Sequence, residues 1–222
     1  MKIIEPSVEF VTPLNGRAVL ERLERCGRVC YKSEDRITQE SAIKFLKGVI
    51  KSGHEAVLEH CSLTVRFTVD RGVSHEIARH RLASYCQEST RYCNYSKDKF
   101  GREITVIRPC FLEVTSNEWR TWEHACAMAE ASYFRLLDMG CTPEEARAVL
   151  PNSLKTEVVM TADIREWRHF LRLRCARAAH PQMREVATQV LHGFYKEFPV
   201  LFDDIYMEML AEATGAKKEG GR

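Results

Sequence analysis

Residues 79–92 concentrate side chains that can bind anions and polar bases. The segment reads RHRLASYCQESTRY and holds three arginines, a histidine, a glutamine and two serines. Arginine presents a planar fork of donors that fits a phosphate or the edge of a base. Serine hydroxyls and backbone N–H groups can complete a phosphate cradle, and Gln87 could read a pyrimidine edge because its amide both donates and accepts. By residue type alone, the segment is either a ligand site or a solvated basic loop.

The spacing R-H-R, seven residues, then serine resembles the signature of the flavin-dependent thymidylate synthases. Arg79, His80, Arg81 and Ser89 match that signature in full, and Arg91 agrees with its usual surroundings. Three further segments agree in order and spacing. They are HEAVLEH at 54–60, EEARAVLPN at 144–152 and DIREWRHFLRLR at 163–174. The resemblance spans most of the chain, from about residue 15 to about residue 200.

This resemblance implies a specific reaction. A methyltransferase of this family converts dUMP to dTMP, with methylenetetrahydrofolate as carbon donor and NADPH-reduced FAD as hydride source, and releases tetrahydrofolate. The family activates the nucleotide without a cysteine nucleophile. Cys86 and Cys93 lie close to the motif, but no partnered base is evident beside either one. The family also assembles as a homotetramer with shared active sites, which we expect here.

The nucleotide residues follow from the matched positions. The doubly charged phosphate of dUMP is expected at Arg91 and Arg147, with the backbone around Ser89, because it needs fixed donors. An arginine at the uracil carbonyl would stabilise the negative charge that develops when hydride reaches the ring. Ser89 is expected to bind the nucleotide rather than to attack it. The substrate set is Glu76, Gln87, Ser89, Arg91, Arg147 and Arg174, and the catalytic set is Arg174, Ser89 and Gln87.

The resemblance places FAD on a second group of residues. Arginines suit its pyrophosphate, and a histidine can stack on the isoalloxazine or hydrogen-bond to it. Asp163 stands where the family more often has asparagine, so it either contacts flavin or only caps a helix. The motif arginines reach FAD and nucleotide together in this family, so the division between the two sets is not sharp. The cofactor set is His54, Arg79, His80, Arg81, Asp163, Arg165 and His169; Arg177 and His180 receive no role because their segment varies in length.

Strand and helix patterns mix without a regular strand–helix–strand repeat. This favours an α+β fold with a mixed, mainly antiparallel sheet and flanking helices, which is the thymidylate synthase-complementing fold that the resemblance implies. A glycine-rich dinucleotide fingerprint after a strand is missing, so the flavin site is expected to be non-Rossmann. The patterns predict a half-buried strand over 63–69 and a long loop over 84–102. They predict helices over 16–26, over 43–50 with Thr38 as cap and over 117–138, and a short helix capped by Ser74. Capping boxes are expected at Thr142–Glu145 and at Asp163–Glu166, the second beginning a helix that runs to about 177, and a final helix is expected to end at about 198.

Composition excludes several classes of protein. A net charge of +2 argues against a nucleic-acid coat, and no apolar run is long enough for a membrane span. The nine cysteines are odd in number and lack paired zinc spacing, so we expect free thiols, no metal and a cytoplasmic protein. Residues 1–214 are expected to form a single catalytic domain, with a disordered tail over 215–222.

Two other functions remain open from the residues alone. A nucleotide-binding protein without catalysis, such as a dUMP sensor, would have no use for FAD and would be colourless. A small RNA-binding module would need exposed aromatic side chains among the arginines, a part that Tyr85, Tyr92 and Tyr95 could play, and its affinity would fall steeply with salt.

Overall fold

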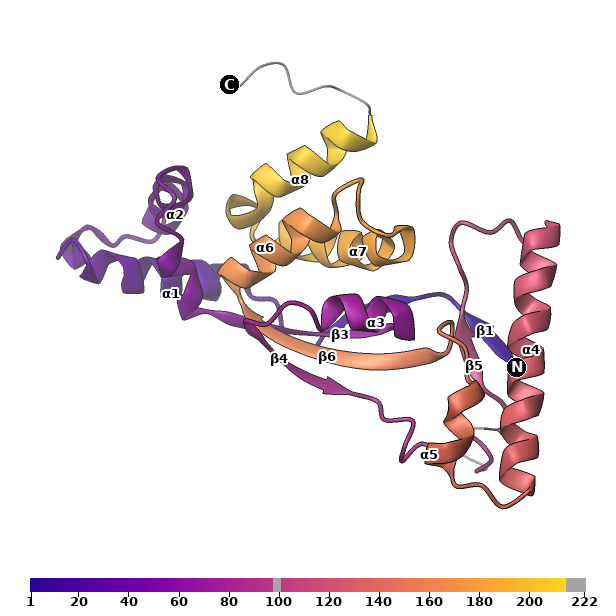
Figure 1. Cartoon of the computed structure of the whole chain (residues 1–222). Helices are drawn as coiled ribbons and strands as arrows, with labels where there is room; N and C mark the ends of the chain where they lie inside the picture. The colour runs from indigo at the N-terminus through magenta and orange to yellow at the C-terminus, as the bar shows by residue number, and fades with distance from the viewer. Residues whose placement is uncertain (98–100, 215–222) are drawn as a thin grey trace. The chain divides into compact units, whose positions relative to one another are not determined.

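The structure, a computed structural model, describes residues 1–97 and 101–214. Figure 1 shows the path of the chain. Its strands are β1 (Lys2–Ile4), β2 (Ser7–Phe10), β3 (Ser62–Asp70), β4 (Ala83–Gln87), β5 (Thr105–Ile107) and β6 (Lys155–Asp163). Its α-helices are α1 (Gly16–Val29), α2 (Ser41–Lys51), α3 (Arg71–Ile77), α4 (Asn117–Asp138), α5 (Pro143–Ala146), α6 (Ile164–Arg174), α7 (Pro181–Glu197) and α8 (Pro199–Ala213), joined by the 3-10 turns η1 (Glu34–Arg36), η2 (Glu55–His60) and η4 (Arg147–Val149).

Helices flank two small sheets, which confirms the expected α+β class with an antiparallel sheet. The larger sheet has four strands in the order β2-β3-β6-β4. The smaller sheet is the parallel pair β1–β5, in which Lys2 lies opposite Thr105. Among the described residues, no helix combines the length and apolar character needed to cross a bilayer. All nine cysteines are free thiols, as expected.

The contacts divide the described chain into two compact units. Unit 1 comprises Met1–Ser7, Arg66–Arg79 and Tyr85–Val159, and unit 2 comprises Val8–Val65, His80–Ser84 and the chain from Met160 on. The single catalytic domain expected over 1–214 stays a prediction. The tail expected over 215–222 lies outside the described residues.

In unit 1, the long helix α4 packs against the β1–β5 pair (Figure 1). Ser116 begins the helix by accepting a hydrogen bond from Trp119 N at 3.1 Å. The inward face carries Cys126 and Tyr133, which are buried together with Val106 of β5. Burying side chains of this size removes apolar area from water at about 25 cal/mol per Å², so this contact holds α4 in place.

In unit 2, the core lies among α6, α7 and α8. The buried rings of Trp167 and Phe194 meet edge to face, with centroids 5.4 Å apart. Helix α7 lies directly against β2. The ring of Phe10 packs so closely on Gly193 that a Cβ at this position would collide with it. This core holds α6, the helix that carries Arg165 and His169 of the predicted flavin set.

Two helix starts differ from the sequence expectation. Ser74 lies inside α3, where its hydroxyl donates to Arg71 O (2.8 Å), and the cap is Asp70, which accepts from Val73 N (2.8 Å). Helix α2 has Glu40 rather than Thr38 at its N-cap position, and no side chain bonds there. In both places a capping residue type stands near the start, but the backbone turns at another position.

Three boundaries also differ. The expected loop over 84–102 begins as strand β4, which is the last strand of the four-stranded sheet. Helix α6 ends at Arg174 rather than near residue 177. The final helix is α8, because the chain re-enters a helix at Pro199, whose fixed φ suits the first helical turn.

Candidate active site

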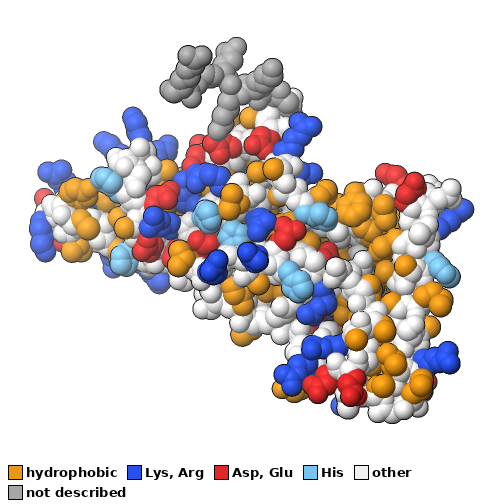
Figure 2. Space-filling model, in the orientation of Figure 1, with side chains coloured by type: hydrophobic (Ala, Val, Ile, Leu, Met, Phe, Trp, Pro, Cys, Tyr) orange, Lys and Arg blue, Asp and Glu red, His pale blue; other side chains and the backbone are white. Residues whose placement is uncertain are grey.

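Helix α6 presents its polar residues through its amphipathic pattern. Trp167 and Phe170 are fully buried in the core of unit 2, which turns the opposite face outward. Arg165 and His169 are four residues apart and both exposed, so they lie one above the other on that face. Figure 2 shows arginine, lysine and histidine side chains gathered with acidic ones around α6.

The start of α6 is only half of the predicted capping box. Asp163 Oδ1 accepts a hydrogen bond from Glu166 N at 2.8 Å, so Asp163 does cap the helix. The Glu166 carboxylate, which would return to the cap backbone in a full box, instead contacts His80: Oε1 lies 3.0 Å from Nδ1. The sequence pattern was therefore right about the cap and wrong about the second carboxylate.

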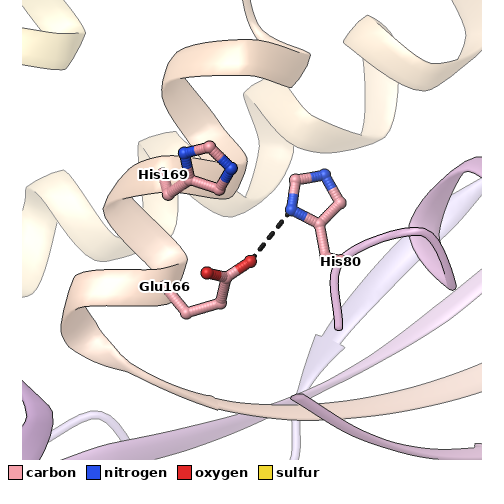
Figure 3. Close-up of side chains that lie close together, drawn as sticks. All are labelled: His80, Glu166 and His169. Carbon is pink, nitrogen blue, oxygen red and sulfur yellow. Dashed lines mark hydrogen bonds and ion pairs between the residues drawn. The ribbon is translucent and has the colours of Figure 1, made fainter. Parts of the chain in front are cut away.

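Glu166, His80 and Arg174 form a hydrogen-bonded chain within unit 2. Figure 3 shows Glu166 and His169 on neighbouring turns of α6 with His80 facing them. Arg174 Nε lies 3.1 Å from His80 Nε2. Because a guanidinium only donates, Nε2 must accept. The ring proton then sits on Nδ1, which donates to Glu166 Oε1.

The surroundings of His80 favour this neutral ring. Burial lowers the pKa of His80, and the charges of Arg174 and His169 lower it further, against the opposing effect of Glu166. Since the folded pKa lies below the unfolded value of 6.5, the unfolded chain binds the proton more readily. The contribution of neutral His80 to stability is complete above the unfolded pKa and is lost as the pH falls through the folded pKa.

His80, Glu166 and His169 also have the composition of a metal site. Their ligand atoms lie within 4.8 Å of one another. Both ring nitrogens of His80 are already engaged, however, one with Glu166 and one with Arg174. A cation here would also lie beside a guanidinium. The expectation that the protein uses no metal stays a prediction.

His54 lies at the edge of a separate cavity in unit 2. This cavity has a volume of about 540 Å³, and its lining includes Tyr31, Phe45, His54 and Val57. Tyr31 Oη lies 3.2 Å from His54 Nδ1. This contact holds the direction of the imidazole, so Tyr31 orients His54; because a hydroxyl both donates and accepts, either tautomer of His54 can make it.

Arg165 and Arg81 are exposed cations of the same unit. Arg165 pairs with Glu59 at 2.5 Å. Exposed ion pairs contribute roughly 0–1 kcal/mol, so an anionic ligand could replace that carboxylate at small cost. Arg168, one turn from Arg165, is buried instead and pairs with Asp204 at 2.7 Å; its role is structural.

In unit 1, hydrogen bonds hold the predicted uracil reader in place. Gln87 Nε2 donates to Ser74 Oγ at 2.9 Å and approaches Thr156 Oγ1 at 3.4 Å. Ser74, misread as a helix cap, therefore orients Gln87. Glu76 lies on the same helix, α3, and is half-buried.

The two predicted phosphate arginines both contact Glu144. Arg91 Nε lies 3.1 Å from Glu144 Oε2, and Arg147 Nε donates to Glu144 O at 3.2 Å. Arg147 also bonds Thr90 Oγ1 at 3.2 Å. Ser89 Oγ accepts from Arg91 N at 3.3 Å and shapes the turn. The structure thus brings Ser89, Arg91 and Arg147 together, as the resemblance implied.

The predicted site residues divide between the two units. Glu76, Arg79, Gln87, Ser89, Arg91 and Arg147 belong to unit 1, and His54, His80, Arg81, Asp163, Arg165, His169 and Arg174 belong to unit 2. This division separates the nucleotide set from the flavin set, apart from Arg79 and Arg174. Sequence reasoning missed the contacts of Glu166, Thr90 and Tyr31, because nothing local marks their partners.

Comparisons with known proteins agree with this arrangement. The family model described as thymidylate synthase complementing protein (Thy1) matches residues 18–200. A flavin-dependent thymidylate synthase of Geobacter sulfurreducens is 33% identical over 201 residues, covering 87% of this chain and 84% of its own length. One from Mycobacterium tuberculosis (strain H37Ra) is 31% identical, covering 94% of this chain and 88% of its own length.

A solved structure is similar as well. The crystal structure of PolB from Streptomyces cacaoi, a UMP/dUMP methylase bound with 5-Br dUMP, superposes with a TM-score of 0.75 at 26% identity. The match covers 91% of this chain and 96% of that chain. The protein therefore belongs to the thymidylate synthase complementing protein family, whose curated relatives are flavin-dependent thymidylate synthases.

Proposed function

We propose that this protein is a flavin-dependent thymidylate synthase that methylates dUMP to dTMP. Methylenetetrahydrofolate is the carbon donor, NADPH-reduced FAD is the hydride source, and tetrahydrofolate is released. The observation that carries the proposal is the family match over residues 18–200. Relatives named flavin-dependent thymidylate synthase match this chain over most of their own length. The solved neighbour, which is bound with 5-Br dUMP, supports a pyrimidine nucleotide as substrate.

The donor set of unit 2 fits FAD. A pyrophosphate needs exposed cations, and Arg81 and Arg165 supply them. An isoalloxazine needs a flat, partly apolar surface with a polar edge, and the cavity at His54 offers Tyr31, Phe45 and a fixed imidazole. When bound, reduced FAD supplies the hydride. Asp163 already accepts the cap bond, so its second oxygen could reach a flavin donor only as an acceptor.

The nucleotide is held mainly by the arginines of unit 1. Arg91 and Arg147 bind the phosphate, which displaces Glu144 from Arg91. Gln87 reads the uracil edge from a side chain already oriented by Ser74. Arg174 donates to the uracil carbonyl and stabilises the charge that builds there as the ring is reduced. Ser89 holds the phosphate loop and needs no base, because the reaction has no serine nucleophile.

Turnover is tested by release of tritium from dUMP labelled at carbon 5, with methylenetetrahydrofolate, NADPH and FAD. The expected result is tritium release that requires methylenetetrahydrofolate, NADPH and FAD together, with dTMP formed in equal amount. Purified protein should also be yellow or become so with FAD. Flavin-loaded, folded protein that binds dUMP but releases no tritium would instead support a nucleotide-binding protein without catalysis.

Replacing Tyr31 by phenylalanine is expected to weaken FAD binding roughly two- to tenfold, because it removes one hydrogen bond of about 0.5–1.5 kcal/mol. That bond fixes His54, while the ring of residue 31 stays in the cavity wall. Quenching of flavin fluorescence measures the affinity. Tyr206→Phe is the control. The ring of Tyr206 stacks on that of Tyr195, with centroids 4.0 Å apart, and Tyr206 does not line this cavity. Equal affinity of the Tyr31 variant and the wild type would remove Tyr31 from the flavin site.

We further propose a cytoplasmic homotetramer with shared active sites. The resemblance to the family, which assembles with shared active sites, supports this proposal. Light scattering on the FAD-loaded protein measures the assembly, and a monomer with full activity would contradict it.

A further inference from the structure

Glu166 is a buried carboxylate without a role in the reaction described above. Its relative exposure is 6%, and it lies on the first turn of α6. Burying an ionised carboxylate is costly unless a hydrogen-bonding partner compensates. That partner is His80 Nδ1, at 3.0 Å. The protein therefore keeps a buried carboxylate that hydrogen-bonds to His80, the histidine of the R-H-R motif.

The ring of His80 is confined on its faces as well as at its nitrogens. It meets the ring of Phe170 edge to face at 4.8 Å and that of His169 at 5.5 Å. A ring flip would put Cδ2 and Cε1 where Nδ1 and Nε2 now lie and break both hydrogen bonds. The orientation of the imidazole is thus set, and what remains variable is the tautomer.

The tautomer decides whether His80 can accept a hydrogen bond from Arg174 Nε. With the proton on Nδ1, the lone pair of Nε2 accepts from Arg174 Nε, 3.1 Å away. With the proton on Nε2, two donors would face each other, and the guanidinium would have to turn away. A carboxylate at Nδ1 selects the first state because it only accepts.

We propose that Glu166 is a positioning residue for Arg174: it holds His80 in the tautomer that accepts from Arg174 Nε and so aims the guanidinium. This inference rests on the proposed function insofar as it assigns the uracil carbonyl to Arg174. The hydrogen-bonded chain itself does not depend on that assignment.

The first test replaces Glu166 by leucine, which removes the acceptor, and by glutamine, which retains an acceptor oxygen. In the leucine variant kcat is expected to fall roughly 10- to 100-fold, with KM for dUMP and bound flavin within about threefold of wild type. The glutamine variant is expected to recover most of kcat. It also keeps the test decisive if the leucine variant does not fold.

A double-mutant cycle separates positioning from general stability. Arg174→Lys keeps the positive charge but has no Nε–H that can bond His80 in the same fork geometry. If Glu166 acts through Arg174, adding Glu166→Leu to Arg174→Lys should lower kcat by less than about twofold. Multiplicative losses in the double variant would overturn the proposal.

The pH profile provides a second readout that a structural role would not move. The ionisable groups acting on His80 are Glu166, Arg174 and His169, all on α6, and Glu166 is the one that raises its pKa. Protonated His80 cannot accept from Arg174, so its titration gives the acid limb of kcat. In Glu166→Leu that limb should shift to lower pH. An unshifted limb would count against the proposal.

Asp204→Asn is the matched control. Asp204 pairs with Arg168 and Arg172 of the same helix, at 2.7 and 3.0 Å. Its loss should lower Tm while leaving kcat and the acid limb unchanged.

A crystal structure of Glu166→Leu decides the matter even if the wild type shows no turnover. Loss of the contact between Arg174 Nε and His80 Nε2 supports the positioning role, whereas its retention at hydrogen-bond distance overturns it. Absence of turnover in the wild type would instead refute the proposed function and leave this structural result standing.

Discussion

Replacing Arg174 by alanine is expected to lower kcat by roughly 10²- to 10³-fold, the usual cost of removing one donor from a developing negative charge. Bound flavin should stay near one per chain, because the exposed cations Arg81 and Arg165 remain. His80 Nε2 accepts from Arg174 Nε at 3.1 Å and so orients the guanidinium. Single-turnover decay of reduced flavin with dUMP and methylenetetrahydrofolate measures the chemical step directly.

Arg172→Ala is the matched control for this prediction. Arg172 lies on the same helix, is 45% exposed and pairs with Asp204, so its removal changes the local charge equally. It should leave kcat within about twofold of wild type, as expected for an exposed ion pair. If Arg174→Ala lost flavin and kcat to the same extent, Arg174 would belong to the cofactor set instead.

Replacing Arg91 by alanine is expected to raise KM for dUMP roughly 10- to 100-fold, because a charge-assisted hydrogen bond contributes about 1.5–3 kcal/mol. Arg147→Ala should act in the same direction, since both side chains meet at Glu144. The effect should be much smaller for deoxyuridine, which has no phosphate. Isothermal titration with dUMP and deoxyuridine measures the difference.

Two variants of unit 1 check the sign of this effect. Arg120→Ala removes an exposed arginine of α4 and should leave the affinity unchanged. Glu144→Gln removes the carboxylate that competes for Arg91 and should strengthen dUMP binding by a few-fold at low salt. Weaker binding in Glu144→Gln would mean that Glu144 orients Arg91 for the phosphate rather than competing with it.

Local patterns predicted the regular elements well. Leu63, Val65 and Phe67 alternate with polar residues, and all three are buried in β3. Helix α4 spans the predicted 117–138. The capping box at Thr142 forms as expected, with Thr142 N donating to Glu145 at 2.8 Å. Each of these signals involves residues within a few positions of one another, where periodicity and capping chemistry operate.

Strand β4 was missed for a physical reason. Its residues Ala83–Gln87 alternate in polarity only over a few positions, and none of them is buried. They form a strand because the sheet offers an open edge beside β6. An edge strand is stabilised by backbone hydrogen bonds to its neighbour rather than by a buried face, and sequence periodicity does not report such pairing.

By itself, the sequence determined the family, the helix and strand periodicities and the residue types needed to bind a nucleotide and a flavin. Only the tertiary structure decided which of those residues pair. The sequence predicted that Glu166 would complete a capping box, because the backbone at Asp163 is the nearest bonding partner along the chain. The fold instead placed His80, 86 positions away, within 3.0 Å of it, and Arg174, 94 positions from His80, at the other ring nitrogen. Hydrogen bonds of such separation depend on how α6 packs against the rest of its unit, and that packing is set by the buried core rather than by any local pattern.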